Sequence, residues 1–266
     1  QLLNKNRVDG VLWTHVSMSC PKGKFQMDRR SMESFWKHYL DMVEKQSDGT
    51  NIMSLAEKPQ QYIPILVDVD LKHDVGSVSP TSSKEPQMEQ YVDPSIKLYT
   101  EEHITSTIEH YQSTIRSILD DCQDKDLTCV VLEKEPYSIV KGNKKYLKNG
   151  FHLHFPYVFL RKMDHELHLI PRVREALQEA QVFTDLGFTD IDKVIDAGYT
   201  KAPWLLYGSA KENGFQPYIA TKVYDAYGTA HSIDDGLAEY PIYNEKEQLI
   251  DMSDKINHYC LLYTSD

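Results

Sequence analysis

The sequence has few cysteines, and its four, Cys20, Cys122, Cys129 and Cys260, form no CxxC pair. This spacing argues against a zinc ribbon and against a disulfide framework, so we expect reduced, structural thiols. No apolar run approaches the roughly 20 residues of a transmembrane helix, and no charged segment followed by an apolar one opens the chain, as it would in a secretion signal. The sequence therefore predicts a soluble, intracellular protein of the cytosol or the nucleus, with no membrane partner.

The chain also lacks an excess of positive charge. It has 29 basic and 40 acidic side chains and a net charge of −11. Proteins that coat nucleic acids are usually basic, so any contact with nucleic acid must come from local patches. The length of 266 residues and the 41% hydrophobic content are typical of a globular protein with one large domain or two small ones. Because the sequence begins at Gln1 without Met and stops at Asp266 without a terminating pattern, we expect a fragment of a longer protein.

Hydrophobic periodicity predicts an alternation of strands and helices. Strands are expected at 11–18, 25–27, 63–70, 128–133, 150–155, 192–196, 204–207 and 218–224. Helices are expected at 31–45, 96–121 and 163–182. His103 and His110 are expected on the surface, and 73–92 is expected to be a flexible loop. The order strand–helix–strand–strand–helix–strand within 62–210 resembles a split βαβ arrangement, which predicts an α+β or α/β fold.

One predicted strand ends by exposing two carboxylates. Side chains alternate between faces along a strand, so Leu66, Asp68 and Asp70 share one face. Carboxylate oxygens suit Mg²⁺ or Mn²⁺, and such sites often leave part of the coordination shell to water and a substrate phosphate. Aspartates at a strand end also commonly cap the following turn. The pair by itself leaves both interpretations open.

A lysine-rich segment, which we expect to be a loop, leads into a strand that carries histidines. Its lysines are Lys141, Lys144, Lys145 and Lys148. In the strand that follows, Gly150, His152 and His154 alternate with apolar residues and therefore share a face. Cationic side chains beside two histidines predict an anion site, although a lysine cluster is also typical of a solvated surface.

Further residues complete a chemically coherent set. Asp196 ends another predicted strand, and Lys211 follows the strand at 204–207. Three carboxylates can hold two divalent ions, which activate an attacking hydroxyl and neutralise a transferring phosphoryl group. Lysines and a histidine would bind the non-bridging oxygens of a triphosphate. The set predicts nucleotidyl transfer, whereas His152 and His154 with one carboxylate would suit a non-haem metal enzyme of mainly β structure.

Three short motifs stand in order along the chain. A hydrophobic strand ends in Asp-x-Asp at 66–70, a small residue precedes x-His at 150–152, and a hydrophobic residue precedes Asp at 194–196. With the segment 204–211, which is similar to a nucleotide-binding segment, they resemble the catalytic domain of the archaeo-eukaryotic primase superfamily. Over about 14–224 the chain looks most like the N-terminal primase domain of the primase-helicases of nucleocytoplasmic large DNA viruses, and more distantly like eukaryotic PrimPol.

This resemblance implies roles for individual residues. Asp68, Asp70 and Asp196 would ligate two divalent ions, Mg²⁺ or Mn²⁺. His152 would contact the phosphates of the incoming NTP or dNTP. The other nucleotide-binding residues that it implies are Lys24, Lys148, Gly150, Ser209 and Lys211. Template contacts are expected from Lys141, Lys144 and Lys145.

The resemblance also implies an architecture and a function. A single catalytic domain over 1–266 would adopt the archaeo-eukaryotic primase fold, an α+β fold. In it, an N-terminal α/β module of about 1–60 packs on an RRM-like module, and the active site between them is built mainly from 61–225. The implied function is a DNA-templated primase that makes short primers on single-stranded DNA for viral-type replication in the host cytoplasm or nucleus, with primer extension left open. A helicase domain is expected beyond residue 266.

Two residues depart from the family pattern. Gly150 stands where the family often has serine, and Leu205 stands where PrimPol relatives have arginine. These departures keep an alternative open, in which the chain is a catalytically weak or inactive single-stranded DNA-binding module of a primase-helicase.

Overall fold

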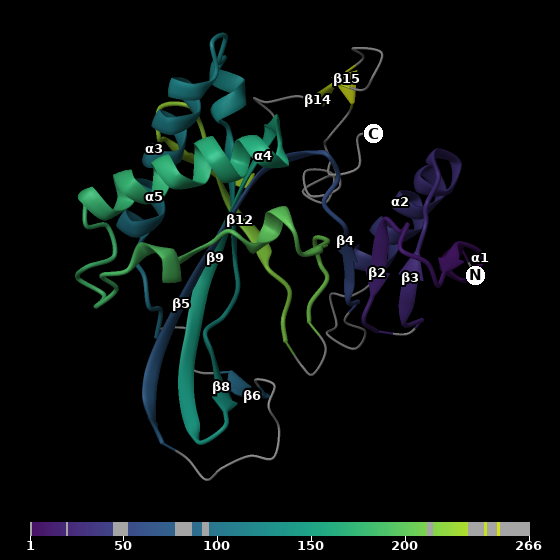
Figure 1. The fold of residues 1–266 in the computed structure, drawn as a ribbon, viewed down its shortest axis with the longest axis horizontal. Helices are drawn as coiled ribbons and strands as arrows, with labels where there is room; N and C mark the ends of the chain where they lie inside the picture. The colour runs from purple at the N-terminus through teal and green to yellow at the C-terminus, as the bar shows by residue number, and fades with distance from the viewer. Residues whose placement is uncertain are drawn as a thin grey trace.

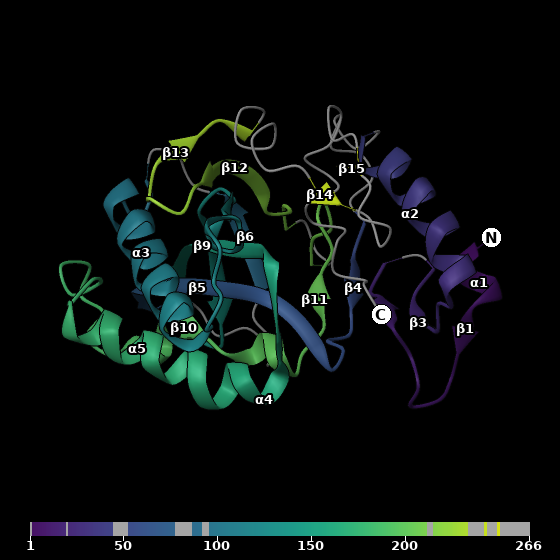
Figure 2. The same cartoon turned by 90° about the horizontal axis from the view of Figure 1, so that it is seen from above.

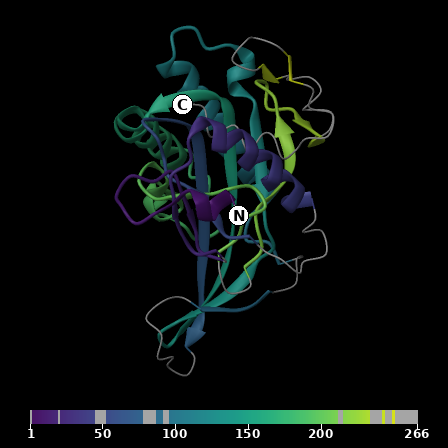
Figure 3. The same cartoon turned by 90° about the vertical axis from the view of Figure 1, so that its right-hand side faces the viewer.

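The computed structural model describes residues 2–19, 21–44, 53–77, 87–91, 96–211, 215–233, 242–243 and 249–250. Its two main sheets lie side by side (Figure 1). One is built mainly from the N-terminal residues and the other from the centre of the chain. Figure 3 views the molecule from the N-terminal side, with the first long helix in front of the long central strands.

The N-terminal sheet has the strand order β1-β3-β2-β4-β11. Its strands are β1 (Arg7–Val8), β2 (His15–Ser17), β3 (Gly23–Phe25), β4 (Leu55–Glu57) and β11 (Trp204–Leu205), and its helices are α1 (Leu2–Lys5) and α2 (Arg29–Glu44). Val16 of β2 is opposite Lys24 of β3, so these two strands form an antiparallel hairpin. The helix α2 begins two residues earlier than predicted because Asp28 caps it, accepting a hydrogen bond from the Ser31 N–H at 2.8 Å.

Aromatic side chains hold α2 on this sheet. Phe35 and Tyr39 stack with their ring centres 5.5 Å apart, and Phe35 packs against the buried His15 of β2 at 5.2 Å. The hydroxyl of Tyr39 also donates to the carbonyl of Tyr207 at 2.7 Å and lies 2.8 Å from Oγ of Ser209. These bonds attach the segment after β11 to the N-terminal module.

The second sheet has the order β10-β5-β9-β7-β12-β13. Its elements, in chain order, are β5 (Tyr62–Ser77), α3 (Glu101–Ile118), β7 (Cys129–Glu133), β9 (Lys144–Arg161), α5 (Ile170–Glu179), β10 (Ile195–Asp196), β12 (Ile219–Tyr224) and β13 (Ala230–His231). In chain order, the first four of these strands are β5, β7, β9 and β10. In the sheet, β10 pairs with β5, and β9 lies between β5 and β7. This is the split βαβ arrangement of an RRM-like module, so the predicted α+β fold is confirmed.

The helices α3 and α5 cover one face of this sheet (Figure 2). Because side chains alternate along a strand, Ile65, Val67 and Val69 of β5 point to these helices and are fully buried. The other face carries Leu66 and Asp68 and is directed towards the N-terminal sheet. The strand β5 therefore separates an apolar core from a face that carries the predicted site.

The strands β5 and β9 extend beyond the rest of the sheet, as the lower part of Figure 1 shows. There β8 (Tyr137–Lys141) pairs with β9, and β6 (Gln87–Tyr91) pairs with β8. We call residues 71–77, 87–91 and 137–148 the arm. The predicted lysine loop is wrong, because these lysines lie on the β8–β9 hairpin, whose turn contains Gly142 at a φ of +65°.

The predicted flexible loop at 73–92 is also wrong in part. The strand β5 continues to Ser77, and β6 forms a further strand within this range. The residues 78–86 and 92 lie outside the described residues.

The predicted helix at 163–182 is a helix with an internal irregularity. It consists of α4 (Lys162–Asp164), the π-helix η3 (His165–Leu169) and α5. Pro171 lies in the first turn of α5. Proline has no N–H to donate to the carbonyl four residues earlier, which accounts for a wider π turn directly before it.

Three further details differ from prediction. The segments 192–196 and 204–207 form strands of only two residues, β10 and β11, which lie in different sheets and flank the turn η5 (Gly198–Thr200). The turn η4 (Ile191–Lys193) occupies the start of the segment that was predicted as a strand at 192–196. His103, predicted on the surface, is 6% exposed because its ring stacks on Phe183 and its Nε2 lies 3.1 Å from Asp185.

The remaining parts are short. The turn η2 (Asp124–Leu127) precedes β7, and β14 (Ile242–Tyr243) pairs with β15 (Leu249–Ile250). Cys122 and Cys129 are free thiols, while Cys20 and Cys260 lie outside the described residues. None of the helices in the described ranges is long and apolar enough to cross a membrane.

Candidate active site

The predicted site residues lie on neighbouring strands of the second sheet. Asp196 of β10 is opposite Asp68 of β5, and Asp68 is opposite His152 of β9. Side chains directly opposite each other in antiparallel strands project from the same face, so these three residues form a row across the sheet. Asp70 lies two residues further along β5 on the same face, opposite Gly150. We call Asp196, Asp68 and His152, together with Asp70, the carboxylate row.

Two of the aspartates lie beside a histidine or a lysine. Oδ1 of Asp68 lies 3.3 Å from Nε2 of His152, and Nζ of Lys148 donates to Oδ2 of Asp70 at 2.7 Å. Burial by itself would raise the pKa of Asp68, but His152 and two lysines described below outweigh it and lower this pKa. Burial lowers the pKa of His152 in spite of the opposing charge of Asp68. The site therefore favours a carboxylate beside a neutral imidazole at neutral pH.

The carboxylates fit a divalent-ion site by residue type and by strand register, but their side chains point to protein partners. Oδ1 of Asp196 accepts the N–H of Gly198 at 2.7 Å. Among the described residues, no group of three or more His, Cys, Asp or Glu side chains is arranged to hold a metal ion. Asp68, Asp70 and Asp196 nevertheless leave the sheet on the same face. These three are the residues that could hold the ions.

Three lysines surround the carboxylate row. Lys148 is on β9, and Lys211, which is exposed, follows β11. The third, Lys134, was not identified from the sequence; it directly follows β7, and its ammonium lies 4.3 Å from the ring centre of Tyr218 and 4.7 Å from that of Tyr137. Burial and the charges of Lys211 and Lys148 lower the pKa of Lys134 to about 7. Like charges repel at this range unless an anion lies between them, so the cluster suits an anionic ligand.

Aromatic rings enclose His152 and connect the row to the N-terminal sheet. The ring of Tyr218 stacks on His152 with the centres 3.5 Å apart, and the indole of Trp204 lies 4.6 Å away. Trp204 belongs to β11, where it is opposite Glu57 of β4. All three rings line one hollow. The candidate site is therefore located between the two modules, as the resemblance implies.

Gly150 leaves no space for a side chain. A Cβ atom at this position would lie 1.9 Å from the carbonyl oxygen of Val69 and 3.0 Å from its carbonyl carbon, both backbone atoms of β5. Serine at this position would require the two strands to separate. The departure from the family pattern therefore follows from the close approach of β5 and β9.

Two predicted nucleotide-binding residues have partners in the N-terminal module. Lys24 is on β3, which β2 and β4 separate from β11, and its ammonium lies 5.3 Å from the ring centre of Trp13. Ser209 is 3% exposed, and its Oγ accepts the N–H of Leu55 at 3.1 Å in addition to its contact with Tyr39. Ser209 also lines the hollow that His152 and Trp204 line, whereas Lys24 does not, and the nucleotide contacts of both stay predictions.

The predicted template-binding lysines lie at the outer end of the arm. They are Lys141, Lys144 and Lys145. Nζ of Lys144 pairs with Asp74 at 2.7 Å. Lys72, which was also not identified from the sequence, is opposite Lys148 and shares a face with Lys141 and Lys144, whereas Lys145 points to the other face.

His154 does not belong to a metal-binding triad. It lines the same hollow as His152, which confirms that they share a face, but it is only 1% exposed. Burial lowers its pKa to about 3. The alternative of a non-haem metal enzyme requires mainly β structure, and it is wrong because the helices α3 and α5 cover one face of the sheet.

A family match covers most of the chain. Residues 14–224 match the family described as "C962R protein N-terminal AEP domain", where AEP denotes archaeo-eukaryotic primase. The carboxylate row and the three lysines around it lie within this range. Families of this type are primase-type nucleotidyltransferases.

Curated relatives come from large DNA viruses. "Putative helicase 121R" of Invertebrate iridescent virus 3 is 33% identical over 244 residues, which cover 90% of this chain and 24% of the relative. "Putative helicase 184R" of Invertebrate iridescent virus 6 is 31% identical over 224 residues, which cover 80% of this chain and 21% of the relative. "Putative helicase L207/L206" of Acanthamoeba polyphaga mimivirus is 23% identical over 212 residues, which cover 78% of this chain and 19% of the relative. This chain thus spans a quarter or less of the length of these relatives. By its family match and these similarities, the chain belongs to the archaeo-eukaryotic primase superfamily, as a domain of the C962R N-terminal type.

Proposed function

We propose that the protein is a DNA-templated primase, which joins nucleotides into short primers on single-stranded DNA with the help of two divalent ions. The observation that supports this most strongly is the strand register that aligns Asp196, Asp68 and His152, with Asp70 beside them. Carboxylates next to a lysine cluster suit a substrate that arrives as a triphosphate together with metal ions.

The carboxylates would hold the ions. Asp68, Asp70 and Asp196 offer the hard oxygen ligands that Mg²⁺ and Mn²⁺ prefer. Ions bound there would supply activation of the primer 3′-hydroxyl and neutralisation of charge on the transferring phosphoryl group. Asp68 is suited to this role because its neighbours lower its pKa and keep it ionised.

The lysines and His152 would bind the triphosphate. Lys134, Lys148 and Lys211 supply point charges for its non-bridging oxygens. The single N–H of a neutral His152 would pass from Asp68 to a phosphate once that carboxylate binds an ion. A triphosphate between the lysines would also relieve the mutual repulsion that contributes to the lowered pKa of Lys134. No covalent intermediate with the protein is needed.

We infer that the template strand follows the arm. Lys141, Lys144 and Lys145 lie at its outer end, and Lys72 lies between them and the row. In a chain with a net charge of −11 this is a local basic patch. Contacts between such lysines and phosphates release counterions, so binding should weaken as the salt concentration rises.

The relatives suggest the setting of this domain. They are named as helicases, and this chain covers a quarter or less of each. We infer that the full-length protein also contains a helicase domain and works where viral DNA is replicated, in the host cytoplasm or nucleus. The domain described here would then supply primers to the same replication machinery.

Primer synthesis on an unprimed single-stranded DNA template tests the proposal. The reaction contains labelled NTPs or dNTPs with Mg²⁺ or Mn²⁺, and the variant is Asp68→Ala/Asp70→Ala. The matched control is Asp120→Ala/Asp121→Ala, which removes two exposed carboxylates far from the row in the fold. Short oligomers from the wild type and the control that disappear in the site variant would support a primase. If the wild type makes no product under any of these conditions, the proposal is contradicted. Retained binding to single-stranded DNA would then favour the alternative of an inactive binding module.

A further inference from the structure

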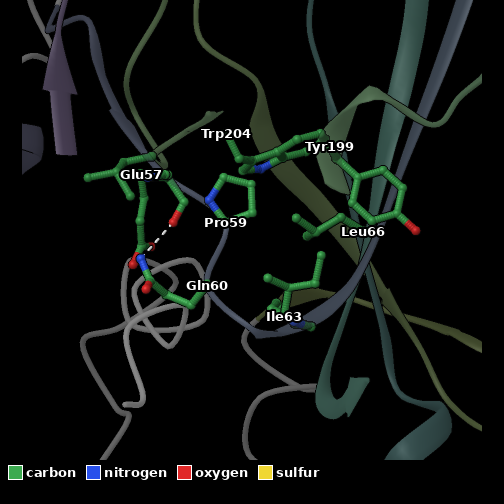
Figure 4. Close-up of a pocket in the computed structure, with 10 residues that line it drawn as sticks. Glu57, Pro59, Gln60, Ile63, Leu66, Tyr199 and Trp204 are labelled. Atoms are coloured by element: carbon green, nitrogen blue, oxygen red, sulfur yellow. Dashed lines mark hydrogen bonds between the residues drawn. The ribbon is translucent and has the colours of Figure 1, made fainter. Parts of the chain in front are cut away.

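A second hollow lies on the same face of β5, at the other end from the arm. It is located between β4 and β5, where β11 approaches both (Figure 4). Its principal lining residues are Ile63, Leu66, Tyr199, Trp204, Glu57 and Gln60. The empty space in it, including the open solvent at its mouth, is about 360 Å³.

Glu57 is an acidic residue without a partner in this hollow. It is 8% exposed, and within the described ranges no hydrogen bond or ion pair reaches its carboxyl group. Burial raises the pKa of this carboxyl well above its usual value, so the protonated form, with one donor and one acceptor side by side, is favoured. A ligand with complementary polar groups could therefore hydrogen-bond to this carboxyl group without displacing a protein partner.

The hollow also lies in line with the phosphate-binding part of the site. Leu66, Asp68 and Asp70 follow each other on one face of β5 at intervals of about 7 Å. Lysines gather at the Asp70 end, where Lys148 pairs with Asp70, while the hollow includes Leu66 at the opposite end. Trp204 joins the two parts, because its indole lines the hollow and lies 4.6 Å from the ring of His152. A nucleotide with its triphosphate at the lysines would direct its base towards the hollow.

We propose that this hollow is a nucleobase subsite, in which the base of the nucleotide bound at the carboxylate row packs against Trp204 and hydrogen-bonds to Glu57. The inference rests on the proposed function, because it requires the triphosphate to lie at the row. Bases outside a duplex are recognised by packing against aromatic or apolar side chains and by hydrogen bonds to their edges. The hollow offers both, with Tyr199 and Leu66 opposite Glu57 (Figure 4). The protein then reads the base of this nucleotide directly, in addition to any pairing with the template.

Equilibrium binding measurements distinguish the contribution of the base to affinity from that of the phosphates. ATP, GTP, CTP, UTP and inorganic tripolyphosphate are titrated by calorimetry in the presence of Mg²⁺. Glu57→Leu removes the donor and the acceptor at similar volume, and Glu57→Gln, whose amide again offers both, is the conservative variant. Glu175→Leu, an exposed position on α5, is the matched control. Thermal unfolding of each variant verifies that it is folded.

We expect Glu57→Leu to weaken the best-bound nucleotide by about tenfold, with tripolyphosphate affinity unchanged within about twofold, and Glu57→Gln to recover most of the loss. Gln60→Trp places a large ring at the mouth of the hollow and leaves its buried wall unchanged. It should weaken nucleotide binding as much as Glu57→Leu does. Unchanged nucleotide affinity in both variants would overturn the subsite and leave the proposed function intact. A wild type that binds neither nucleotides nor tripolyphosphate would overturn the proposed function, and the subsite with it.

Discussion

Nε2 of His152 lies 3.3 Å from Oδ1 of Asp68, its direct partner across β5 and β9. The imidazole is held between Tyr218 at 3.5 Å and Trp204 at 4.6 Å, so the contacts that orient it come from both modules. His152 can therefore act as a fixed hydrogen-bond donor next to a carboxylate, and it need not be charged to do so.

Removal of this imidazole should impair nucleotide incorporation. We expect His152→Ala to reduce the single-turnover rate by about 100-fold or more, because a positioned donor is lost where charge develops on the phosphoryl group. The control is His38→Ala, an exposed position on α2. An unaltered rate in His152→Ala would exclude this residue from the reaction.

Lys134 predicts a pH dependence of anion binding. Burial and the charges of Lys211 and Lys148 lower its pKa to about 7, so it is charged below that pH and increasingly neutral above it. The affinity for tripolyphosphate should therefore decrease as the pH rises through 7. Lys134→Met should bind about tenfold more weakly at low pH and vary less with pH. Calorimetry on this variant and on the exposed control Lys125→Met measures the difference, and parallel pH profiles would assign the dependence to another group.

The carboxylate row could be predicted because its strands have a clear period. Side chains alternate between the two faces along 63–70 and 150–155, so the sequence determines which of them share a face. This does not depend on which strands pair with these segments. Asp196 is different, because β10 has only two residues and no period of its own. The sequence marked it as a carboxylate at a strand end, but its place directly beside Asp68 results from long-range pairing with β5, which no local pattern predicts.

Lys134 and Glu57 were missed for a related reason. Nothing near either residue in the sequence marks it as unusual. Lys134 becomes significant because Tyr218, from a distant part of the chain, packs under its ammonium. Glu57 is buried in a sheet that is completed by β11, where Trp204 pairs opposite it. Tertiary contacts, and not local patterns, determine both environments.

Gly150→Ser tests the close approach of β5 and β9. A Cβ atom would lie 1.9 Å from the carbonyl oxygen of Val69, so we expect a loss of stability of at least about 1–3 kcal/mol. Urea denaturation measures the free energy of unfolding. Gly10→Ala is the control, since a Cβ atom there would meet nothing within 4 Å. Equal stability of Gly150→Ser and the wild type would show that the strands separate at little cost.

The arm should determine the salt dependence of template binding. We expect the triple variant Lys141→Gln/Lys144→Gln/Lys145→Gln to reduce the slope of log K against log salt concentration by about 2, because each lost contact with single-stranded DNA removes about 0.7. Fluorescence anisotropy with a labelled oligonucleotide measures the slope.

The matched control for the arm removes the same charge elsewhere. It is Lys5→Gln/Lys37→Gln/Lys125→Gln, at three exposed positions outside the arm. An equal change of slope in both triple variants would indicate a general effect of net charge. An unchanged slope in the arm variant would place the template on another surface.

Buried histidines predict that the fold is destabilised by acid. Burial lowers the pKa of His15 from 6.5 to about 4. It also lowers the pKa of His165 to about 4 and that of His154 to about 3. The unfolded chain therefore binds protons at a higher pH than the folded one. The stability that each neutral histidine contributes is complete above pH 6.5 and is lost as the pH falls towards 4. At pH 5 the loss from His15 alone is about 2 kcal/mol.

Comparison of His15→Gln with the wild type isolates this contribution. The free energy of unfolding is measured at pH 7 and pH 5, and the variant should lose about 2 kcal/mol less between them. Burial raises the pKa of Glu57, which stabilises the fold towards low pH, but this effect is common to both proteins. His38→Gln, at an exposed position, should follow the wild type. If His15→Gln loses as much stability as the wild type between pH 7 and pH 5, protonation of His15 on unfolding does not contribute to the acid sensitivity.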